Sequence, residues 1–126
     1  MIKKIDVIAV DLDGTVWNDN FPDYDEPYED AIDVINEFIY KGIEVVIWTS
    51  RYMENANKGV FMLIDKYGLN PNVKINEHAN IYLGKYDKRS NKIAADVYID
   101  DRAYGAPDFS EKGAWKKIRE EILANE

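Results

Sequence analysis

The sequence predicts an α/β fold in which a parallel sheet carries helices on both faces. Short apolar runs that read as buried strands alternate along the chain with segments of helical periodicity, which is the pattern of this class. A length of 126 residues, of which 46% are hydrophobic, suits one domain with one core. Right-handed crossovers between parallel strands then give a single-domain, Rossmann-like sheet over residues 1–126, most simply in the strand order 3-2-1-4.

The first half of the chain contains two expected strands and the helix between them. Residues 5–10 are apolar and predict a buried first strand, and the polar residues 16–26 predict a loop above its carboxyl end. Pro27 suits the first position of a helix, and Gly42 suits the position just after its end. Residues 44–48 form a second apolar run, which predicts a second buried strand.

The second half continues the alternation and adds a long irregular segment. We expect, in order, a helix over 55–66, a short strand over 73–75, an irregular stretch over 76–91, a strand over 93–99 and a final helix. Ser110 is the expected N-cap of the final helix. His78 falls in the irregular stretch, and we interpret it as a surface-loop residue without a catalytic role.

Composition excludes several classes of protein. Sixteen basic and 24 acidic residues leave a formal charge of −8, so that we expect no nucleic-acid partner. The absence of cysteine excludes disulfides, thiol nucleophiles and cysteine-based zinc sites, and one histidine cannot build a multi-histidine metal site. No apolar run reaches membrane-spanning length, and we therefore expect a cytoplasmic protein that does not enter a membrane.

The stretch around which the chain is organised follows the first strand directly. It reads Asp11-Leu12-Asp13-Gly14-Thr15. Residues two apart on a strand share a face, so that the carboxylates of Asp11 and Asp13 converge at the end of the strand. Paired carboxylates of this kind suit Mg²⁺, which keeps its other positions for water and substrate phosphate. The alternative is an Asp-Gly hairpin turn.

This pentapeptide resembles the first motif of the haloacid dehalogenase (HAD) superfamily of phosphohydrolases. The resemblance implies that Asp11 is the nucleophile and that Asp13 is the general acid and base. It also implies hydrolysis of a phosphate monoester through an aspartyl-phosphate intermediate, with Mg²⁺ as the cofactor. The other motifs of that family must then follow in order along the chain.

The second and third motifs of the family supply groups that contact the phosphate. Thr49 directly follows the second apolar run and is the candidate for the second motif, with Ser50 as its rival. The alternative is that Thr49 has only a structural role, because threonine is common at strand ends. For the third motif, a Lys or Arg, we prefer Lys92 because it stands just before the fourth expected strand. The alternatives are Lys85, Lys88 and Arg89.

The fourth motif of the family is an acidic pair after an apolar strand. Asp100 and Asp101 stand at the end of the fourth expected strand and match it, although a polar loop start or a helix cap would look alike. By the resemblance, Mg²⁺ would bind Asp11, the backbone carbonyl of Asp13, and Asp100 or Asp101. Two adjacent acids at a buried strand end repel each other unless a cation lies between them, which favours a metal site.

The segment from Lys92 through Asp100-Asp101-Arg102, followed by Gly105 and Pro107-Asp108, resembles a group of small HAD hydrolases that have no cap domain. The stretches 16–26 and 76–91, where such a domain would be inserted, are too short for one. An open site implies a bulky substrate such as a phosphorylated saccharide, or a homo-oligomer that covers the site. The main alternatives are a polynucleotide 3′-phosphatase and a non-catalytic Mg²⁺-binding interaction module of the same fold. Arg51 and Arg102 have no fixed role in the family pattern and are candidates for substrate or structural contacts.

Overall fold

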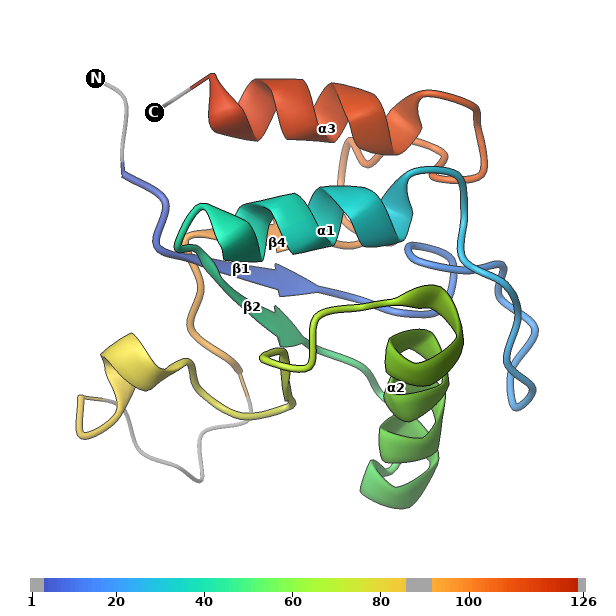
Figure 1. Cartoon of the computed structure of the whole chain (residues 1–126), viewed down its shortest axis with the longest axis horizontal. Coiled ribbons are helices and arrows are strands. Elements are labelled where there is room, and N and C mark those ends of the chain that lie inside the picture. Colours follow the sequence, from blue (N-terminus) through green and yellow to red (C-terminus); the bar gives the residue numbers. More distant parts are fainter. Residues whose placement is uncertain (1–3, 86–91, 125–126) are drawn as a thin grey trace.

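A four-stranded parallel sheet forms the centre of the computed structural model, which describes residues 4–85 and 92–124. Its strands are β1 (Val7–Val10), β2 (Glu44–Ile47), β3 (Lys74–Ile75) and β4 (Val97–Ile99). They lie in the order β3-β2-β1-β4, which confirms the predicted topology (Figure 1). Val10 pairs with Ile47 on one side and with Ile99 on the other. The three strands therefore end at the same level, and the residues that follow them meet at one edge.

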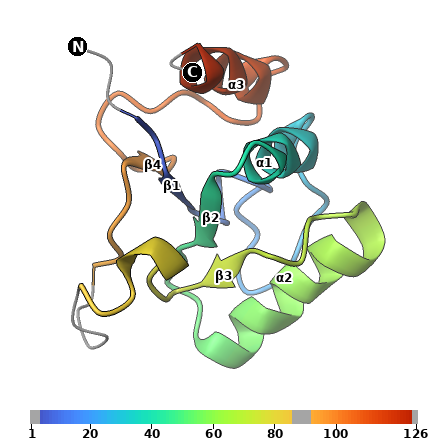
Figure 2. The same ribbon diagram turned by 60° about the vertical axis from the view of Figure 1, so that its left-hand side comes forward.

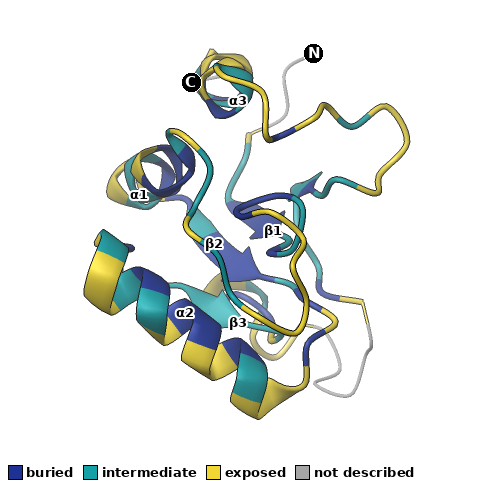
Figure 3. Cartoon of the chain, turned by 90° about the vertical axis from the view of Figure 1, so that its right-hand side faces the viewer, coloured by how far each residue is buried: buried dark blue, intermediate teal, exposed yellow. Residues whose placement is uncertain are grey.

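Three α-helices pack on one face of this sheet. They are α1 (Ala31–Tyr40), α2 (Met53–Tyr67) and α3 (Ala114–Leu123), and all contribute to one apolar cluster with alternate residues of the strands. The buried residues in Figure 3 lie along the sheet and the inner sides of the helices. Within this cluster Trp17 and Trp115 are fully buried, and the Trp115 indole donates a hydrogen bond of 2.9 Å to the Thr15 carbonyl.

The sequence predicts α-helices on both faces of the sheet, but in the described residues the opposite face carries no α-helix. A short 3₁₀ helix, η1 (Asn80–Tyr82), lies there, and Ala79 and Ile93 pack on Val7 and Val46 (Figure 2). The physical reason is that the sequence from 76 to 96 is mostly polar, so that it offers no long apolar stripe for a helix. His78 belongs to this cover. Its side chain is buried, so that its interpretation as a surface-loop residue is wrong.

The first helix starts later than the sequence predicts. Pro27 forms an isolated antiparallel bridge with Trp17, and the N–H of Tyr28 donates to the Val16 carbonyl at 2.7 Å. These contacts hold the segment extended, and α1 begins only at Ala31 after Asp30, whose φ is 67°. The expected loop over residues 16–26 is thus closed by one bridge at its base.

Other element boundaries also differ from the predicted ones. Ser110 does not cap the last helix, because its backbone N–H and hydroxyl both bond the Asp108 carboxylate and α3 begins after Gly113. The second helix begins two residues earlier than expected, at Met53, and the fourth strand is shorter, beginning at Val97. None of the helices in the described ranges, 4–85 and 92–124, is both long and apolar enough to cross a membrane.

Candidate active site

Three carboxylates meet where β1 and β4 end. Ligand atoms of Asp11, Asp100 and Asp101 all lie within 4.8 Å of one another. The backbone N–H of Asp11 donates to the Ile99 carbonyl at 3.0 Å, which extends the pairing of β1 and β4 to the acids themselves. The parallel register therefore brings together the first and fourth sequence motifs, which lie far apart along the chain.

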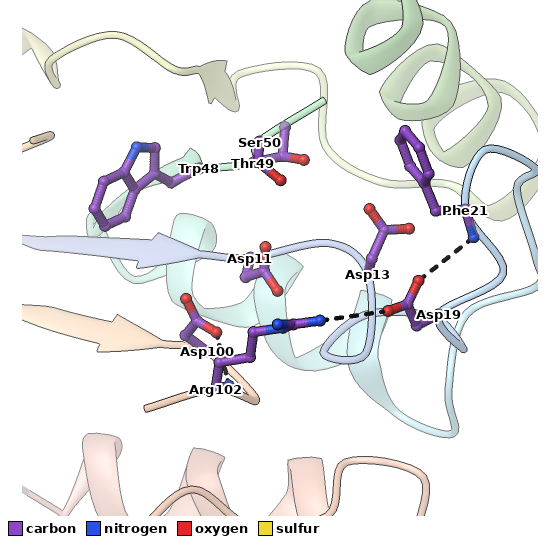
Figure 4. A pocket seen from close by; sticks show the side chains of 9 residues that line it. All are labelled: Asp11, Asp13, Asp19, Phe21, Trp48, Thr49, Ser50, Asp100 and Arg102. Atoms are coloured by element: carbon purple, nitrogen blue, oxygen red, sulfur yellow. Dashed lines mark hydrogen bonds and ion pairs between the residues drawn. The ribbon is translucent and has the colours of Figure 1, made fainter. Parts of the chain in front are cut away.

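The two residues after Asp13 hold Asp101 in this cluster. The Thr15 hydroxyl accepts a hydrogen bond from the Asp101 N–H at 2.9 Å and lies 3.4 Å from the Asp101 Oδ1. Gly14 has a φ of 82°, and a Cβ added there would overlap the Asp101 Oδ2. Only glycine leaves room for this carboxylate. Asp100 instead faces the pocket beside Asp11 (Figure 4).

The electrostatics of the cluster fit a bound cation. Burial, the charges of Asp100 and Asp101, and a hydrogen bond with Asp101 raise the pKa of Asp11 to about 8. A carboxyl group with such a pKa is only partly ionised at neutral pH, because its negative neighbours are not compensated. Hard oxygen ligands in this number match a divalent cation such as Mg²⁺. The residues present thus fit a metal ion, with Asp11 and Asp100 facing the pocket.

Asp13 is held by a different set of contacts. Its carboxylate accepts two hydrogen bonds from the Arg51 guanidinium, at 2.9 Å from Nε and 2.7 Å from Nη2, and a third from the Trp17 indole at 2.8 Å. Burial alone would raise the pKa of Asp13, but the hydrogen bonds from Arg51 and Trp17 outweigh it and lower that pKa. In this arrangement Asp13 is an ionised base beside Asp11.

Arg51, a candidate for substrate or structural contacts in the sequence, makes structural contacts around the candidate site. Its guanidinium also donates to the carbonyls of Pro22 and Asp23, at 2.9 and 2.7 Å, and to the Asn55 side chain. Its side chain is fully buried. One residue therefore joins the proposed proton-transfer group, the loop after β1 and the start of α2. The position directly after the Thr49-Ser50 pair was the only sequence signal for this role.

Thr49 lies in the pocket at the end of β2, as the sequence predicts. Its backbone is fixed by Asn76, whose side chain accepts from the Thr49 N–H and donates to the Thr49 carbonyl, both at 2.8 Å. Its hydroxyl oxygen accepts from the Arg51 N–H at 3.1 Å, which leaves the hydroxyl proton for a phosphate oxygen. Ser50 also lines the pocket but is exposed, whereas Thr49 is buried.

The position of the third motif stays a prediction. Lys92 is exposed, and its Nζ lies 5.1 Å from the centre of the Tyr98 ring. Lys92 is not among the described residues that line the pocket. Tyr98 packs in turn on Trp48, a pocket residue, with 5.6 Å between ring centres. Lys85 lies over the Tyr82 ring. Lys88 and Arg89, which are also candidates for this motif, fall outside the described residues.

The pocket around these groups has a volume of about 590 Å³, within the usual range for small-molecule sites. It is lined by Asp11, Asp13, Asp19, Phe21, Trp48, Thr49, Ser50, Asp100 and Arg102. Figure 4 shows that these side chains surround an opening above the strand ends, with Asp11 near its centre. The sequence predicted the catalytic candidates at this edge, but it contained no signal for Asp19, Phe21 and Trp48.

Comparison with known proteins agrees with this geometry. Residues 8–103 match the model of a family described as haloacid dehalogenase-like hydrolase, and this match covers most of the chain. The chain belongs to the haloacid dehalogenase-like hydrolases. This confirms the family suggested by the motif around Asp11, and the described residues form no cap domain over the pocket. No curated protein matches the chain.

One solved structure is similar over almost the whole chain. It is described as the structure of a conserved protein coded by a locus from Bacteroides thetaiotaomicron. It is 26% identical, the match covers 95% of this chain and 91% of that chain, and the TM-score is 0.75. The likeness supports the fold over the full length compared, and its description assigns no activity.

Proposed function

We propose that this HAD-like hydrolase is a Mg²⁺-dependent phosphomonoesterase that forms an aspartyl-phosphate on Asp11. The observation that carries the proposal is the cluster of Asp11, Asp100 and Asp101, with Asp13 lining the same pocket. Burial and like charge make this arrangement unfavourable without a cation. Phosphoryl transfer to a carboxylate requires such a cation.

Three acidic residues would hold the metal ion. They are Asp11, Asp100 or Asp101, and Asp13 through its backbone carbonyl. When bound, Mg²⁺ offsets the negative charge shared by the carboxylate and the phosphate oxygens as they approach each other. Asp101 is anchored by Thr15, whereas Asp100 faces the pocket, which supports Asp100 as the direct ligand.

The bond changes take place on Asp11. One of its carboxylate oxygens attacks phosphorus, the bond from phosphorus to the alcohol oxygen breaks, and the electron pair leaves with that oxygen. The Thr49 hydroxyl, whose proton is available, donates to a non-bridging phosphate oxygen. Lys92, or another of the basic residues of that region, neutralises a second one.

Asp13 moves the protons in both halves of the reaction. As a general acid it delivers a proton to the leaving oxygen, and as a base it takes a proton from the water that hydrolyses the aspartyl-phosphate. Its resting form in this proposal is the carboxylate, because Arg51 and Trp17 donate hydrogen bonds to it. Asp13 must therefore carry a proton before the first half, which weakens its contact with Arg51, and delivery of that proton to the leaving oxygen restores the contact; uptake of a proton from water in the second half weakens it again.

A substrate panel with and without metal tests the proposal. We expect release of phosphate from 4-nitrophenyl phosphate and from sugar phosphates with Mg²⁺, and none with EDTA. Asp11→Asn should lose this activity, while Asp33→Asn, the same change on the exposed side of α1, should keep it. Activity that is equal with EDTA or in Asp11→Asn would contradict the proposal. A 3′-phosphorylated oligonucleotide tests the polynucleotide alternative, and a panel without any hydrolysis would support the non-catalytic module.

A further inference from the structure

The side chain of Asn76 supports the chain where it leaves the end of β2. The register of β2 and β3 ends at Ile47 and Ile75, and the Asn76 N–H donates once more to the Ile47 carbonyl at 2.9 Å. Beyond this point the Asn76 side chain continues the pairing. Its Oδ1 accepts from the Thr49 N–H and its Nδ2 donates to the Thr49 carbonyl, both at 2.8 Å. The amide therefore does for Thr49 what a further residue of β3 would do.

The backbone of Asn76 adopts a conformation that few residues tolerate. Its φ is 53°, in the left-handed region, which asparagine enters more readily than most other non-glycine residues. Glycine would suit this turn but has no side chain to bond Thr49. Aspartate could accept from the Thr49 N–H but could not donate to the Thr49 carbonyl. The position thus combines a left-handed turn with a pair of hydrogen bonds that needs the amide.

Thr49 is consequently held from two directions. On the β1 side, the N–H of the preceding Trp48 donates to the Val10 carbonyl at 2.8 Å, and on the β3 side Asn76 binds Thr49 itself. The order β3-β2-β1-β4 places Thr49 after β2 and Asp11 after β1, and in Figure 4 Asp11 lies between Thr49 and Asp100. Thr49 therefore lies across the nucleophile candidate from the acids that follow β4.

We infer that Asn76 is a positioning residue for the transferred phosphate and that it acts through Thr49. This inference rests on the proposed function, in which the Thr49 hydroxyl donates to a non-bridging phosphate oxygen. Asn76 is not among the described residues that line the pocket, so that its effect on the substrate is indirect. A hydrogen bond between hydroxyl and phosphate oxygens requires a separation of about 2.5–3.0 Å and weakens steeply when it is bent. Without the amide, the buried Thr49 backbone loses both of its partners, and the hydroxyl moves out of line.

A double-mutant cycle in kcat/KM for 4-nitrophenyl phosphate tests whether Asn76 acts through the Thr49 hydroxyl. Asn76→Gly removes the amide and suits the left-handed turn. It should lower kcat/KM by about tenfold, which corresponds to the loss of one hydrogen bond to a charged group. Thr49→Val removes the hydroxyl and should cause at least the same loss. In the Thr49→Val background, Asn76→Gly should then change kcat/KM by less than about twofold, because the group that it positions is gone.

A matched control separates this effect from a loss of stability. Asn36 on α1 makes the same kind of contacts outside the pocket, since its side chain accepts from the Asn70 N–H at 2.8 Å and donates to the Gly68 carbonyl at 2.9 Å. Asn36→Ala should lower the Tm, as Asn76→Gly does, but should leave kcat/KM unchanged. Asn76→Gly should also leave unchanged the Mg²⁺ concentration that gives half-maximal activity, because the candidate metal ligands follow β1 and β4.

Two further measurements keep the test decisive if Asn76→Gly does not fold. Asn76→Asp retains an acceptor for the Thr49 N–H and loses only the donor, and its effect on kcat/KM should depend on the Thr49 hydroxyl in the same way. Thr49→Ser keeps both the hydroxyl and the acceptor for the Arg51 N–H, and in this background the Asn76 variants should still lose about tenfold. Inorganic phosphate should inhibit the Asn76 variants about tenfold less tightly than it inhibits the parent.

An equal loss from the Asn76 variants in the parent and in Thr49→Val would overturn the inference, because Asn76 would then support the fold and not the hydroxyl. An unchanged kcat/KM in the Asn76 variants or in Thr49→Val would overturn it as well. In all of these cases hydrolysis of 4-nitrophenyl phosphate by the parent would show that the proposed function still holds. If the parent hydrolyses no phosphate ester, the proposed function fails and the inference fails with it.

Discussion

The carboxylate of Asp13 lies in the fork of the Arg51 guanidinium, with contacts of 2.9 and 2.7 Å. Asp13 belongs to the loop after β1 and Arg51 lies two residues before the start of α2 at Met53, so that the pair joins two segments that converge only in the folded chain. The Arg51 side chain is 0% exposed and that of Asp13 is 17% exposed. The pair is thus both a structural link and a constraint on the group that we propose for proton transfer.

A double-mutant cycle measures this link. Asp13→Asn or Arg51→Gln should each lower the free energy of unfolding by about 3 kcal/mol, because each leaves a buried partner without its counter-charge. The double variant should be less destabilised than the sum of the two, with a coupling energy of about 1–3 kcal/mol. Urea unfolding at pH 7 gives these values. Additive effects would show that the contact contributes little.

The same pair predicts a dependence of stability on pH. Because the pKa of Asp13 is lowered in the folded state, its contribution is complete above its unfolded pKa of about 4 and is lost as the pH falls toward the folded value. The stability difference between the parent and Asp13→Asn should therefore shrink below about pH 4. A difference that stays constant down to about pH 3 would contradict the assignment.

The role of Asp13 in proton transfer is tested separately from its role in the fold. Asp13→Asn should lose about 10² to 10⁴-fold in rate with a sugar phosphate, the usual value of general acid–base catalysis. The loss in the first step should be smaller with an aryl phosphate, whose leaving group departs without a proton. Mg²⁺ affinity should change little, since only the backbone carbonyl of Asp13 would contact the metal. An equal loss for all leaving groups, together with weaker Mg²⁺ binding, would instead make its side chain a metal ligand.

Asp11 should destabilise the metal-free protein at neutral and alkaline pH. Its pKa is raised to about 8, so that ionisation is disfavoured in the folded state, and stability falls as the pH rises from its unfolded pKa of about 4 toward 8. Asp11→Asn removes this charge and should have a higher Tm than the parent at pH 8 with EDTA, but a similar one at pH 4. Mg²⁺ should raise the Tm of the parent, and it should raise the Tm of the Asp11→Asn variant much less. A parent that is as stable as Asp11→Asn at pH 8 would contradict this electrostatic account.

Gly14 provides a test of how the acidic cluster is held. Gly14→Ala should weaken Mg²⁺ binding, because the added Cβ would overlap the Asp101 carboxylate and displace it. Gly42→Ala is the matched control, since Gly42 has a φ of 91° and no atom within 4 Å of an added Cβ. Both variants carry the strain of a left-handed backbone, but only the first should change metal affinity in a titration. Equal affinity in the two variants would mean that Asp101 does not matter for the metal.

Local patterns in the sequence were sufficient for the fold and for most of the site. The apolar run before Asp11 and the one before Asp100 each end at the edge of a parallel sheet, and the order of the strands follows from crossover handedness. Asp11, Asp13, Thr49 and Asp100 could therefore be placed together from the sequence alone. The start of α1 could not be predicted in this way, because Pro27 forms a β-bridge with Trp17 that no local propensity encodes.

The remaining site residues depend on packing between distant segments. Arg51 acquires its role only because the loop after β1 folds over it, and Phe21 enters the pocket for the same reason. His78 is buried because its neighbour Ala79 packs on the sheet, whereas a polar sequence context indicates a solvated loop. Contacts of this kind are set by the tertiary structure, and no sequence spacing reports them.

The most direct test of the account is to trap the phosphorylated residue. Asp13→Asn should be mixed rapidly with 4-nitrophenyl phosphate and Mg²⁺, quenched in acid, digested and analysed by mass spectrometry. We predict a burst of nitrophenol and one phosphoryl group, labile to hydroxylamine, on the peptide that contains Asp11, because breakdown of the intermediate lacks its base. Hydrolysis by this variant without any phosphorylated peptide, or with the phosphoryl group on another residue, would contradict the central claim that Asp11 is the nucleophile.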